Sequence, residues 1–145
     1  MSAPKLVYIA GPFSPTKAQL ALFGKAVTKY MARRCVEENI LRAKLLGVKV
    51  AKLGACPMIP HANTDHPDFE EVQPYQFWIE ATKEQLRRCD AVLFAEDWEE
   101  SSGARGENEV AIEESIPRFF SLNDLAGWLH QGALTDLGIN WANVH

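Results

Sequence analysis

Apolar residues gather along this chain in short runs that are separated by longer amphipathic segments. Residues 6–10 are rich in strand-forming types and end at the turn signal Gly11-Pro12. Residues 91–95 are the clearest buried strand, and 116–120 predicts a short last one. Apolar residues at helical spacing predict helices over 17–53, 75–88, 107–115 and 122–129.

The first helical segment leaves two questions open. It is either one helix or two, because residues 31–35 are compatible with a break. At 47–53 valines alternate with lysines as in a strand, but Gly54 is equally well placed as the left-handed residue that ends a helix. We favour a helix that continues to Leu53, which leaves 55–59 as the second strand.

Strands that alternate with helices predict an α/β domain with a parallel sheet. Such sheets bind ligands beyond the carboxyl ends of their strands, which selects loops 11–16, 60–74 and 96–106. Asp90 precedes its strand, so we interpret it as a structural residue. The candidate site residues that this rule places near one crevice are Tyr8, His61, Asn63, Asp97, Trp98, Ser101, Arg105 and Glu107.

Length, charge and cysteine content narrow the class of protein. A chain of 145 residues is expected to form one domain, 1–145. The net charge of -4 argues against binding a nucleic acid, although a few placed donors can hold a small anion. Three scattered cysteines favour a reducing cytoplasm over a disulfide framework. We expect no membrane partner, because neither a signal peptide nor an apolar run of roughly 20 residues is present.

The strongest local signal for chemistry runs from Trp98 to Glu107. Gly103 and Gly106 permit close backbone approach, and Arg105 offers a fork of donors that suits phosphate. Glu107 is expected in the first turn of a helix, where free N–H groups and the helix dipole favour a charged carboxylate. Such a carboxylate suits the nucleophile of a glycosidic cleavage, and helix capping is the alternative.

The loop after the first strand is a weaker candidate. Gly11, Pro12, Phe13 and Ser14 resemble a phosphate- or sugar-binding turn, but they form neither a dinucleotide-binding nor a P-loop motif. An ordinary strand-to-helix turn explains their spacing equally well. Tyr8, among apolar neighbours, has the pattern of a core tyrosine with its hydroxyl at the edge.

Two further patterns are ambiguous. His61, Asp65, His66 and Asp68 cluster in a polar segment but match no zinc motif, so we expect no metal and no organic cofactor. Trp98 is placed either to stack on a base or to pack its loop onto the domain.

Four blocks of sequence resemble one known superfamily. They are VYIAGP at 7–12, ENI at 38–40 with PMIPHANT at 57–64, LRRCDAVL at 86–93, and WEESSGARGE at 98–107. Together they are similar to the nucleoside 2-deoxyribosyltransferase-like superfamily, nearest to a group of small phage and bacterial proteins and related to nucleoside-monophosphate N-glycosidases. The resemblance implies a Rossmann-like three-layer sandwich with a short parallel sheet of about four to five strands, usually assembled as a homodimer or larger homo-oligomer.

The resemblance also implies roles for individual residues. Glu107 would be the nucleophile that forms a glycosyl-enzyme intermediate, and Tyr8 would orient its carboxylate or contact the sugar. Ser101 and Gly103 belong to the same Ser-x-Gly-x-x-x-Glu block. A serine at the position of Ser101 meets the 5′-phosphate in the monophosphate hydrolases. Ser101, with Arg105 nearby, therefore favours a 5′-monophosphate substrate.

One residue departs from the superfamily pattern. Thr82 stands where the relatives carry an aspartate that protonates the leaving base, and a threonine hydroxyl does not supply a proton at neutral pH. Glu80 and Glu84 project about 160–200° away from Thr82 on a helix, and Asp97 and His61 are other candidates. Three options stay open: another acid, a base that departs without much help, or a chain that binds without catalysing.

The first hypothesis is that Glu107 cleaves the N-glycosidic bond of a (deoxy)nucleoside 5′-monophosphate and releases the free base. The alternatives are a nucleoside deoxyribosyltransferase of the same mechanism, and a nucleotide-binding or sensing module without turnover. The expected partner is a small nucleotide or nucleoside. The hypothesis predicts that the Glu107 carboxylate lines a crevice together with Tyr8 and Ser101.

Overall fold

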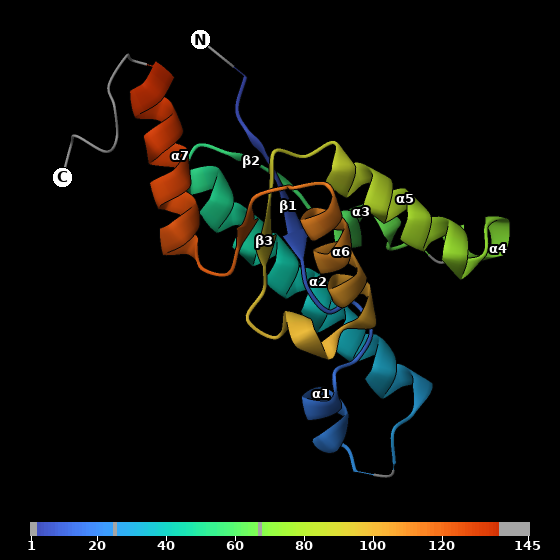
Figure 1. Ribbon diagram of the computed structural model, residues 1–145. Coiled ribbons are helices and arrows are strands. Elements are labelled where there is room, and N and C mark those ends of the chain that lie inside the picture. The colour runs from blue at the N-terminus through green and yellow to red at the C-terminus, as the bar shows by residue number, and fades with distance from the viewer. Residues whose placement is uncertain (1–2, 25, 67, 137–145) are drawn as a thin grey trace.

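A four-stranded parallel sheet with helices on both faces organises the molecule (Figure 1). The computed structural model describes residues 3–24, 26–66 and 68–136. The α/β class and the Rossmann-like three-layer architecture are thus confirmed. The expected single domain, 1–145, includes residues 1–2, 25, 67 and 137–145, which lie outside the described residues. The strands, in the sheet order β2-β1-β3-β4, are β2 (Cys56–Met58), β1 (Leu6–Ala10), β3 (Ala91–Phe94) and β4 (Arg118–Phe119).

Two pairs of helices cover the two faces of the sheet. Alternate residues of β1 point to opposite faces, as the period of a strand requires. Val7 and Ile9 pack with α2 (Lys29–Lys52) and α7 (Leu122–Asp136). Tyr8 and Ala10 pack on the other face. That face is covered by α5 (Tyr75–Arg87) and α6 (Ser102–Glu113).

The central strand β1 is locked to β3 by side-chain as well as backbone contacts. Tyr8 is in register with Val92, and both strands are buried along almost their whole length. The Asp90 carboxylate accepts a hydrogen bond of 2.7 Å from the Leu6 N–H, at the amino ends of the two strands. Asp90 therefore has the structural role that its place before β3 predicts.

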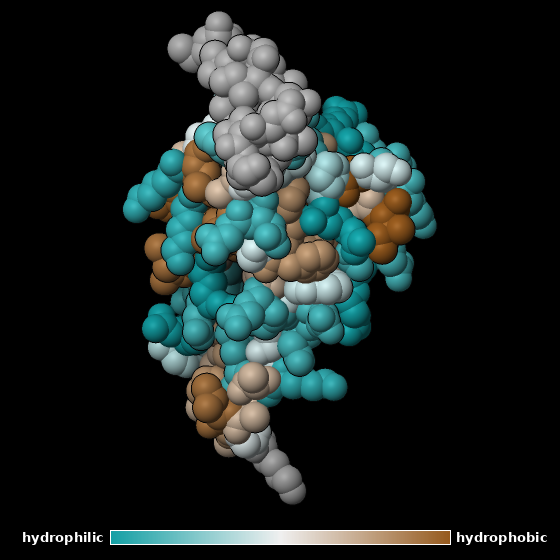
Figure 2. Space-filling view, turned by 60° about the vertical axis from the view of Figure 1, so that its left-hand side comes forward, coloured by the Kyte–Doolittle hydropathy of each residue, from teal (hydrophilic) through white to brown (hydrophobic). Residues whose placement is uncertain are grey.

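The segment 17–53 contains two helices, and the break lies at 22–28 rather than at 31–35. The short α1 (Lys17–Ala21) begins at a capping box in which Thr16 and Gln19 bond reciprocally. Gly54 has φ +90, so α2 ends as the left-handed glycine predicts. No helix in the described part of the chain is long and apolar enough to cross a membrane. Apolar side chains are nevertheless exposed at the end of the molecule formed by α1 (Figure 2), where Leu22 is 83% exposed.

The expectation of a loop over 60–74 is wrong, because two short helices form there: α3 (Pro60–Thr64) and α4 (Phe69–Val72). Proline is favourable at the first position of a helix, and Pro60 begins α3. α4 is held by tertiary contacts, since the Phe69 ring stacks on Trp78 at 4.9 Å and its carbonyl accepts the indole N–H. A long-range contact of this kind leaves no local sequence pattern.

The start of α6 also differs from the prediction. A single 3-10 turn, η1 (Trp98–Glu100), is followed by Ser101, whose hydroxyl accepts the Ala104 N–H at 3.1 Å and caps the helix. α6 therefore begins at Ser102, and Glu107 lies in its second turn rather than its first. The free N–H groups at the start of α6 are therefore not the groups that neighbour the Glu107 carboxylate in the chain.

Candidate functional site

Glu107 and Tyr8 meet between the sheet and its α5–α6 layer. Tyr8 is fully buried, and its hydroxyl interacts with Glu107 and with the Thr82 hydroxyl. Among the described residues, neither Tyr8 Oη nor Glu107 Oε2 has a hydrogen-bond partner of good geometry, although both atoms are buried. The two groups thus influence each other's ionisation without forming a regular hydrogen bond. Buried polar atoms in this condition are rare and costly, which marks the pair as a candidate site.

Burial controls the charge of this pair. It raises the pKa of Glu107 to about 8, against the opposing effects of the Tyr8 hydroxyl and the positive charge of Lys83. The pKa of Tyr8 is raised well above its usual value, first by burial and then by the Glu107 charge. The expectation that Glu107 lies in the first turn of a helix is wrong, because it lies in the second turn of α6, and burial is the largest influence on its pKa.

Lys83 is the cation beside Glu107, and the sequence analysis missed it. Its amine lies against α6 at Gly106, where an added Cβ would come within 3.9 Å of Nζ. Lys83 also forms an ion pair of 3.8 Å with Glu80 and keeps 26% of its side chain exposed. In the sequence Lys83 is marked only by its position next to Thr82. That position is a weak signal, because neighbouring residues of a helix point in different directions.

Glu80 and Glu84, two candidates to replace the missing aspartate, have other partners on α5. Thr82 Oγ1 donates a hydrogen bond of 2.9 Å to the Ile79 carbonyl. Glu80 pairs with Lys83 and accepts from Gln76, while Glu84 pairs with two arginines on the exposed face of α5. Glu84 therefore serves the helix surface and does not take part in the Glu107–Tyr8 pair.

The other candidates in the 97–107 segment have structural partners. The Ser101 hydroxyl caps α6, and the Arg105 guanidinium donates to the Glu99 carbonyl at 3.0 Å. An added Cβ at Gly103 would lie 3.6 Å from Ser101 Oγ, an ordinary contact. The phosphate-binding roles of Ser101 and Arg105 stay predictions, and the structure gives each residue a local function as well.

Trp98 and Asp97 both serve the packing of their loop. The Trp98 indole lies 4.9 Å from the Phe94 ring and 5.7 Å from Phe120, which gives it a packing role, and stacking on a base stays a prediction. Asp97 forms an ion pair of 2.8 Å with Arg42 of α2. This pair connects the loop after β3 to the opposite helical layer.

The loop after β1 is fixed from two sides. Gly11 approaches the loop after β3 so closely that an added Cβ would lie 2.9 Å from the Ala95 Cβ, so a glycine is required. His61 Nε2 lies 3.0 Å from the Gly11 carbonyl, and the His61 ring stacks on Phe13 at 5.6 Å. The buried Asn39 amide donates to the Phe13 and Ser14 carbonyls, each at 3.1 Å. Asn39, which the candidate residues did not include, thus positions this loop.

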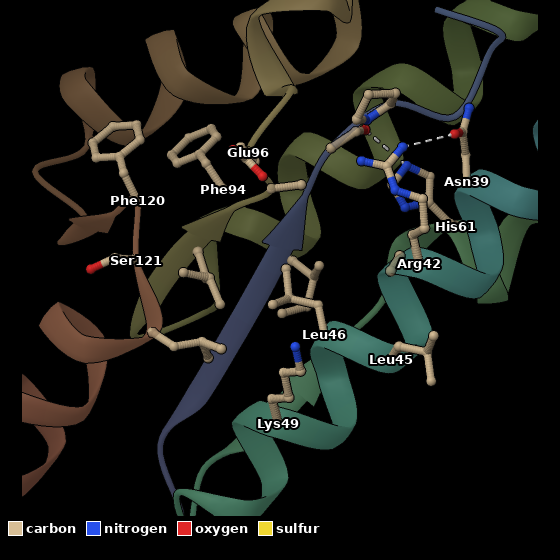
Figure 3. A pocket seen from close by; sticks show the side chains of 17 residues that line it. Asn39, Arg42, Leu45, Leu46, Lys49, His61, Phe94, Glu96, Phe120 and Ser121 are labelled. Carbon is tan, nitrogen blue, oxygen red and sulfur yellow. Dashed lines mark hydrogen bonds between the residues drawn. The ribbon is translucent and has the colours of Figure 1, made fainter. Parts of the chain in front are cut away.

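A cavity of about 600 Å³ opens at the carboxyl ends of β1 and β3, on the α2–α7 face of the sheet (Figure 3). Gly11, Pro12 and His61 line it, as the rule for parallel sheets predicts. Tyr8, Glu107 and Ser101 do not line this cavity, so the crevice that all three are expected to share stays a prediction. The further polar residues of its wall are Asn39, Arg42, Lys49, Glu96 and Ser121.

The contribution of α2 to this cavity was not predicted from the sequence. Asn39, Arg42, Leu46 and Lys49 are three or four residues apart and thus share one face of the helix. That spacing was readable, but nothing in the sequence said that this face would meet the end of β1. Asn63, by contrast, is exposed on α3 and does not line the cavity.

The polar segment after β2 shows no metal-binding arrangement. Asp65 forms an ion pair of 2.9 Å with Arg33, and His66 Nδ1 accepts the Asp68 N–H at 3.2 Å. Within residues 3–24, 26–66 and 68–136, no three histidine, cysteine or acidic side chains gather as metal ligands would. The segment is therefore explained by local ion pairs and hydrogen bonds.

One family model, described as a domain of unknown function (DUF4406), matches residues 37–117, more than half of the chain. The chain belongs to this DUF4406 family. The DUF4406 match begins in α2 and continues through α6, so it contains His61, Thr82 and Glu107 but not Tyr8. No curated protein is significantly similar to this DUF4406 chain.

Proposed function

We propose that this DUF4406 protein cleaves the N-glycosidic bond of a (deoxy)nucleoside 5′-monophosphate, with Glu107 as the nucleophile. The observation that carries the proposal is the buried Glu107–Tyr8 pair, whose pKa values are both strongly raised. Titratable groups perturbed by burial and by a specific charged neighbour concentrate at functional sites. The resemblance to the nucleoside 2-deoxyribosyltransferase-like superfamily supports the proposal, because it gives the same two positions catalytic roles.

In the proposed reaction Glu107 first gives its proton to water. A carboxylate oxygen then attacks the anomeric carbon, and the bond from that carbon to the base nitrogen breaks. The base leaves with the bonding electrons and takes a proton from water, since Thr82 does not provide one. Water finally hydrolyses the glycosyl ester, which releases the sugar phosphate and restores Glu107.

Two alternatives differ from this reaction in one respect each. In a deoxyribosyltransferase a second base, rather than water, attacks the glycosyl ester. In a nucleotide-binding module no ester forms at all. The second alternative is favoured by Thr82, which stands where the superfamily carries the acid that protonates the leaving base.

Base release from a panel of ribo- and deoxynucleoside 5′-monophosphates, followed by chromatography, tests the proposal. We expect the wild type to release base and the Glu107→Gln variant to lose at least about 1000-fold of that rate. Glu109→Gln is the matched control, because Glu109 is an exposed glutamate on the same helix. An added acceptor base distinguishes transfer from hydrolysis.

The same experiment separates the enzyme from the binding module. If no member of the panel releases base, the glycosidase proposal is wrong. A nucleotide that raises the melting temperature but survives incubation unchanged then supports the binding module. Equal rates in wild type and Glu107→Gln would contradict the assignment of the nucleophile.

The chain is also proposed to form a homodimer through α2. Leu41, Leu45 and Val48 are 55%, 54% and 51% exposed and are four and three residues apart, so they form a stripe on one side of the helix. Glu38 and Lys52 extend this stripe at its two ends with the same spacing. If two copies of α2 pack antiparallel about Leu45, Glu38 faces the partner's Lys52, so the stripe is complementary to itself.

A reducing cytoplasm is the proposed location. Cys35, Cys56 and Cys89 are all free, and the Cys56 thiol belongs to an exposed residue. An exposed free thiol is stable in a reducing compartment and prone to oxidation elsewhere.

A further inference from the structure

The proposed cleavage needs a proton for the base that leaves, and Thr82 does not supply it. The Thr82 hydroxyl already donates to the Ile79 carbonyl at 2.9 Å. A base that departs as an anion is a poor leaving group, so a positioned proton donor is worth roughly a 10²–10⁴-fold increase in rate. A side chain with an exchangeable proton beside Glu107 would therefore have a function in this reaction.

The Lys83 ammonium lies beside the proposed nucleophile. Lys83 belongs to α5 and Glu107 to α6, and both helices cover the same face of the sheet (Figure 1). A Cβ added at Gly106, the residue before Glu107, would lie 3.9 Å from Lys83 Nζ. Burial raises the pKa of Glu107, and the positive charge of Lys83 opposes that effect. Because electrostatic effects weaken with distance, the ammonium and the carboxyl group are close neighbours.

A glycine leaves the Lys83 side chain uncovered on the side of α6. Gly106 lies inside this helix, where a glycine destabilises the helix by about 1 kcal/mol relative to alanine. Its φ is outside the positive range that favours glycine, and an added Cβ would make only ordinary contacts, with Lys83 Cε at 3.6 Å. Neither the backbone nor close packing therefore requires a glycine here. The missing side chain keeps space open beside Lys83, next to the residue that attacks the sugar.

A row of polar residues on α5 holds Lys83 from the solvent side. Gln76, Glu80 and Lys83 are four and three residues apart, so they share one face of the helix. Gln76 Nε2 donates to Glu80 Oε1 at 2.9 Å, and the same oxygen lies 3.8 Å from Lys83 Nζ. Lys83 keeps 26% of its side chain exposed, so it can exchange protons with water. The Lys83 side chain thus extends between solvent and the buried Glu107–Tyr8 pair.

We propose that Lys83 is the acid–base residue of the glycosidic cleavage: its ammonium protonates the leaving base, and the resulting amine takes a proton from the water that hydrolyses the glycosyl ester. This inference rests on the proposed function, and it replaces water by Lys83 as the proton donor in that reaction. The division of labour is that of retaining glycosidases, in which one residue is the nucleophile and a second acts first as acid and then as base.

Protons and electrons balance over the two steps. In the first, Glu107 bonds to the anomeric carbon, the bond from that carbon to the base nitrogen breaks, and its electrons accept the Lys83 proton. In the second, the water oxygen bonds to the same carbon, and Glu107 leaves as a carboxylate. The proton released by that water restores the Lys83 ammonium.

Two substrates that differ in their leaving groups test this role. A nucleoside 5′-monophosphate of the panel needs a proton on its base, whereas 4-nitrophenyl ribofuranoside 5-phosphate, or its 2-deoxy form, releases a nitrophenolate that needs none. We expect Lys83→Met to slow base release about 100-fold or more, and nitrophenolate release less than about threefold. Because Glu107 attacks both substrates and both carry the phosphate, changes in its ionisation or in phosphate binding cancel in the ratio of the rates.

Lys83→Arg separates the proton from the charge. Arginine keeps the positive charge but does not give up a proton in proteins. With the nucleotide we therefore expect Lys83→Arg to be nearly as slow as Lys83→Met. Lys44→Met is the matched control and should retain the wild-type rate, because Lys44 is an exposed lysine of α2, on the other face of the sheet. Melting temperatures of the three variants show whether each is folded.

The outcomes distinguish the role of Lys83 from the proposed function. Equal losses with both substrates, or recovery of the nucleotide rate in Lys83→Arg, would show that Lys83 acts through its charge alone and would overturn its acid–base role. Base release that Lys83→Met leaves unchanged would remove Lys83 from the reaction and leave the glycosidase in place. If the nitrophenyl compound is not cleaved, the Lys83→Arg comparison decides alone. A wild type that cleaves neither substrate overturns both proposals.

Discussion

Glu107 shows how the environment of one residue decides which reaction it can perform. A carboxylic acid in water is ionised at neutral pH, but burial beside the Tyr8 hydroxyl raises the pKa of Glu107 to about 8. Lys83 and Tyr8 both favour the charged form, and their combined effect is smaller than the cost of burial. A carboxyl nucleophile with this pKa is mostly protonated at pH 7, and its reactive ionised fraction increases as the pH rises.

The rate of base release should therefore depend on pH with the signature of Glu107. Only the ionised carboxylate attacks, so kcat is expected to rise about tenfold per pH unit below pH 8 and to level off above it. Single-turnover rates between pH 5 and pH 9.5 measure this profile. A rate that levels off near pH 4–5 would contradict the burial argument. In a Lys83→Met variant the midpoint should move upward, because the positive charge that favours ionisation is gone.

The features of the site differ in how far they could be predicted from the sequence. The nearness of Tyr8 and Glu107, which are far apart in sequence, was anticipated from the rule for parallel sheets and from the resemblance. The helix spacing of Asn39, Arg42 and Lys49 was visible without a known partner surface. The neutral state of Glu107 was missed because it depends on the three-dimensional packing of α5 and α6 around it.

At the scale of elements, α2 has a different task on each side. Its inner face packs on β1 through Ala43 and Val50 and supplies Arg42 and Lys49 to the cavity. Its outer side carries the apolar stripe, defined above by Leu41, Leu45 and Val48. Leu45 belongs to both regions, so association through the stripe would also enclose the rim of the cavity.

A charge exchange along α2 tests the proposed dimer. Glu38→Lys or Lys52→Glu alone places like charges opposite each other in the antiparallel pair, so each variant should lower dimer affinity by several-fold. The double variant Glu38→Lys/Lys52→Glu restores opposite charges and should recover the dimer. Sedimentation equilibrium at several concentrations measures the three proteins and the wild type.

An apolar-to-charged pair of variants completes this test. Val48→Glu should produce a monomer, whereas Leu22→Glu should leave association unchanged, because Leu22 is 83% exposed just after α1 and lies outside the stripe. A wild type that is monomeric at all concentrations, or a double charge variant that fails to recover, would show that another surface or none is used.

The elements themselves followed the sequence where local signals were strong. β1, β3, the capping box at Thr16 and the left-handed Gly54 all have patterns that need no distant partner. α4 and the start of α6 were misjudged, because Trp78 holds the first and a serine cap competes with the expected start at Glu107 in the second. Tertiary contact and competition between caps are the physical reasons for these two errors.

At the scale of the whole molecule, β1 connects the Glu107–Tyr8 pair with the cavity. Tyr8 points to the α5–α6 face, where it meets Glu107, and Ile9 points to the other face and lines the cavity. A change in the register or tilt of β1 would therefore affect the pair and the cavity at once.

The buried acid should also make global stability depend on pH. The folded pKa of Glu107 is about 8 and its ordinary value is 4.5, so between these values the unfolded state binds fewer protons. Stability should thus fall as pH rises from 4.5 to 8, by on the order of 1 kcal/mol per pH unit from this group. Urea unfolding at pH 5, 6.5 and 8 measures the slope, with buffers of about equal ionic strength.

Two variants test whether Glu107 causes the dependence of stability on pH. Glu107→Gln should remove most of it and be more stable than the wild type at pH 8, whereas Glu109→Gln, an exposed residue, should retain it. If wild type and Glu107→Gln lose stability in parallel over this range, Glu107 is ionised in the folded protein.

The order of the strands has a consequence for how the protein is made. β1 leaves the ribosome first, yet both of its neighbours come later in the chain, β2 at Cys56–Met58 and β3 at Ala91–Phe94. Until β3 has been synthesised, one edge of this apolar central strand has no native partner. The nascent chain is therefore open to wrong pairing from the synthesis of β1 to that of β3, and this is the interval in which chaperones would have to protect it.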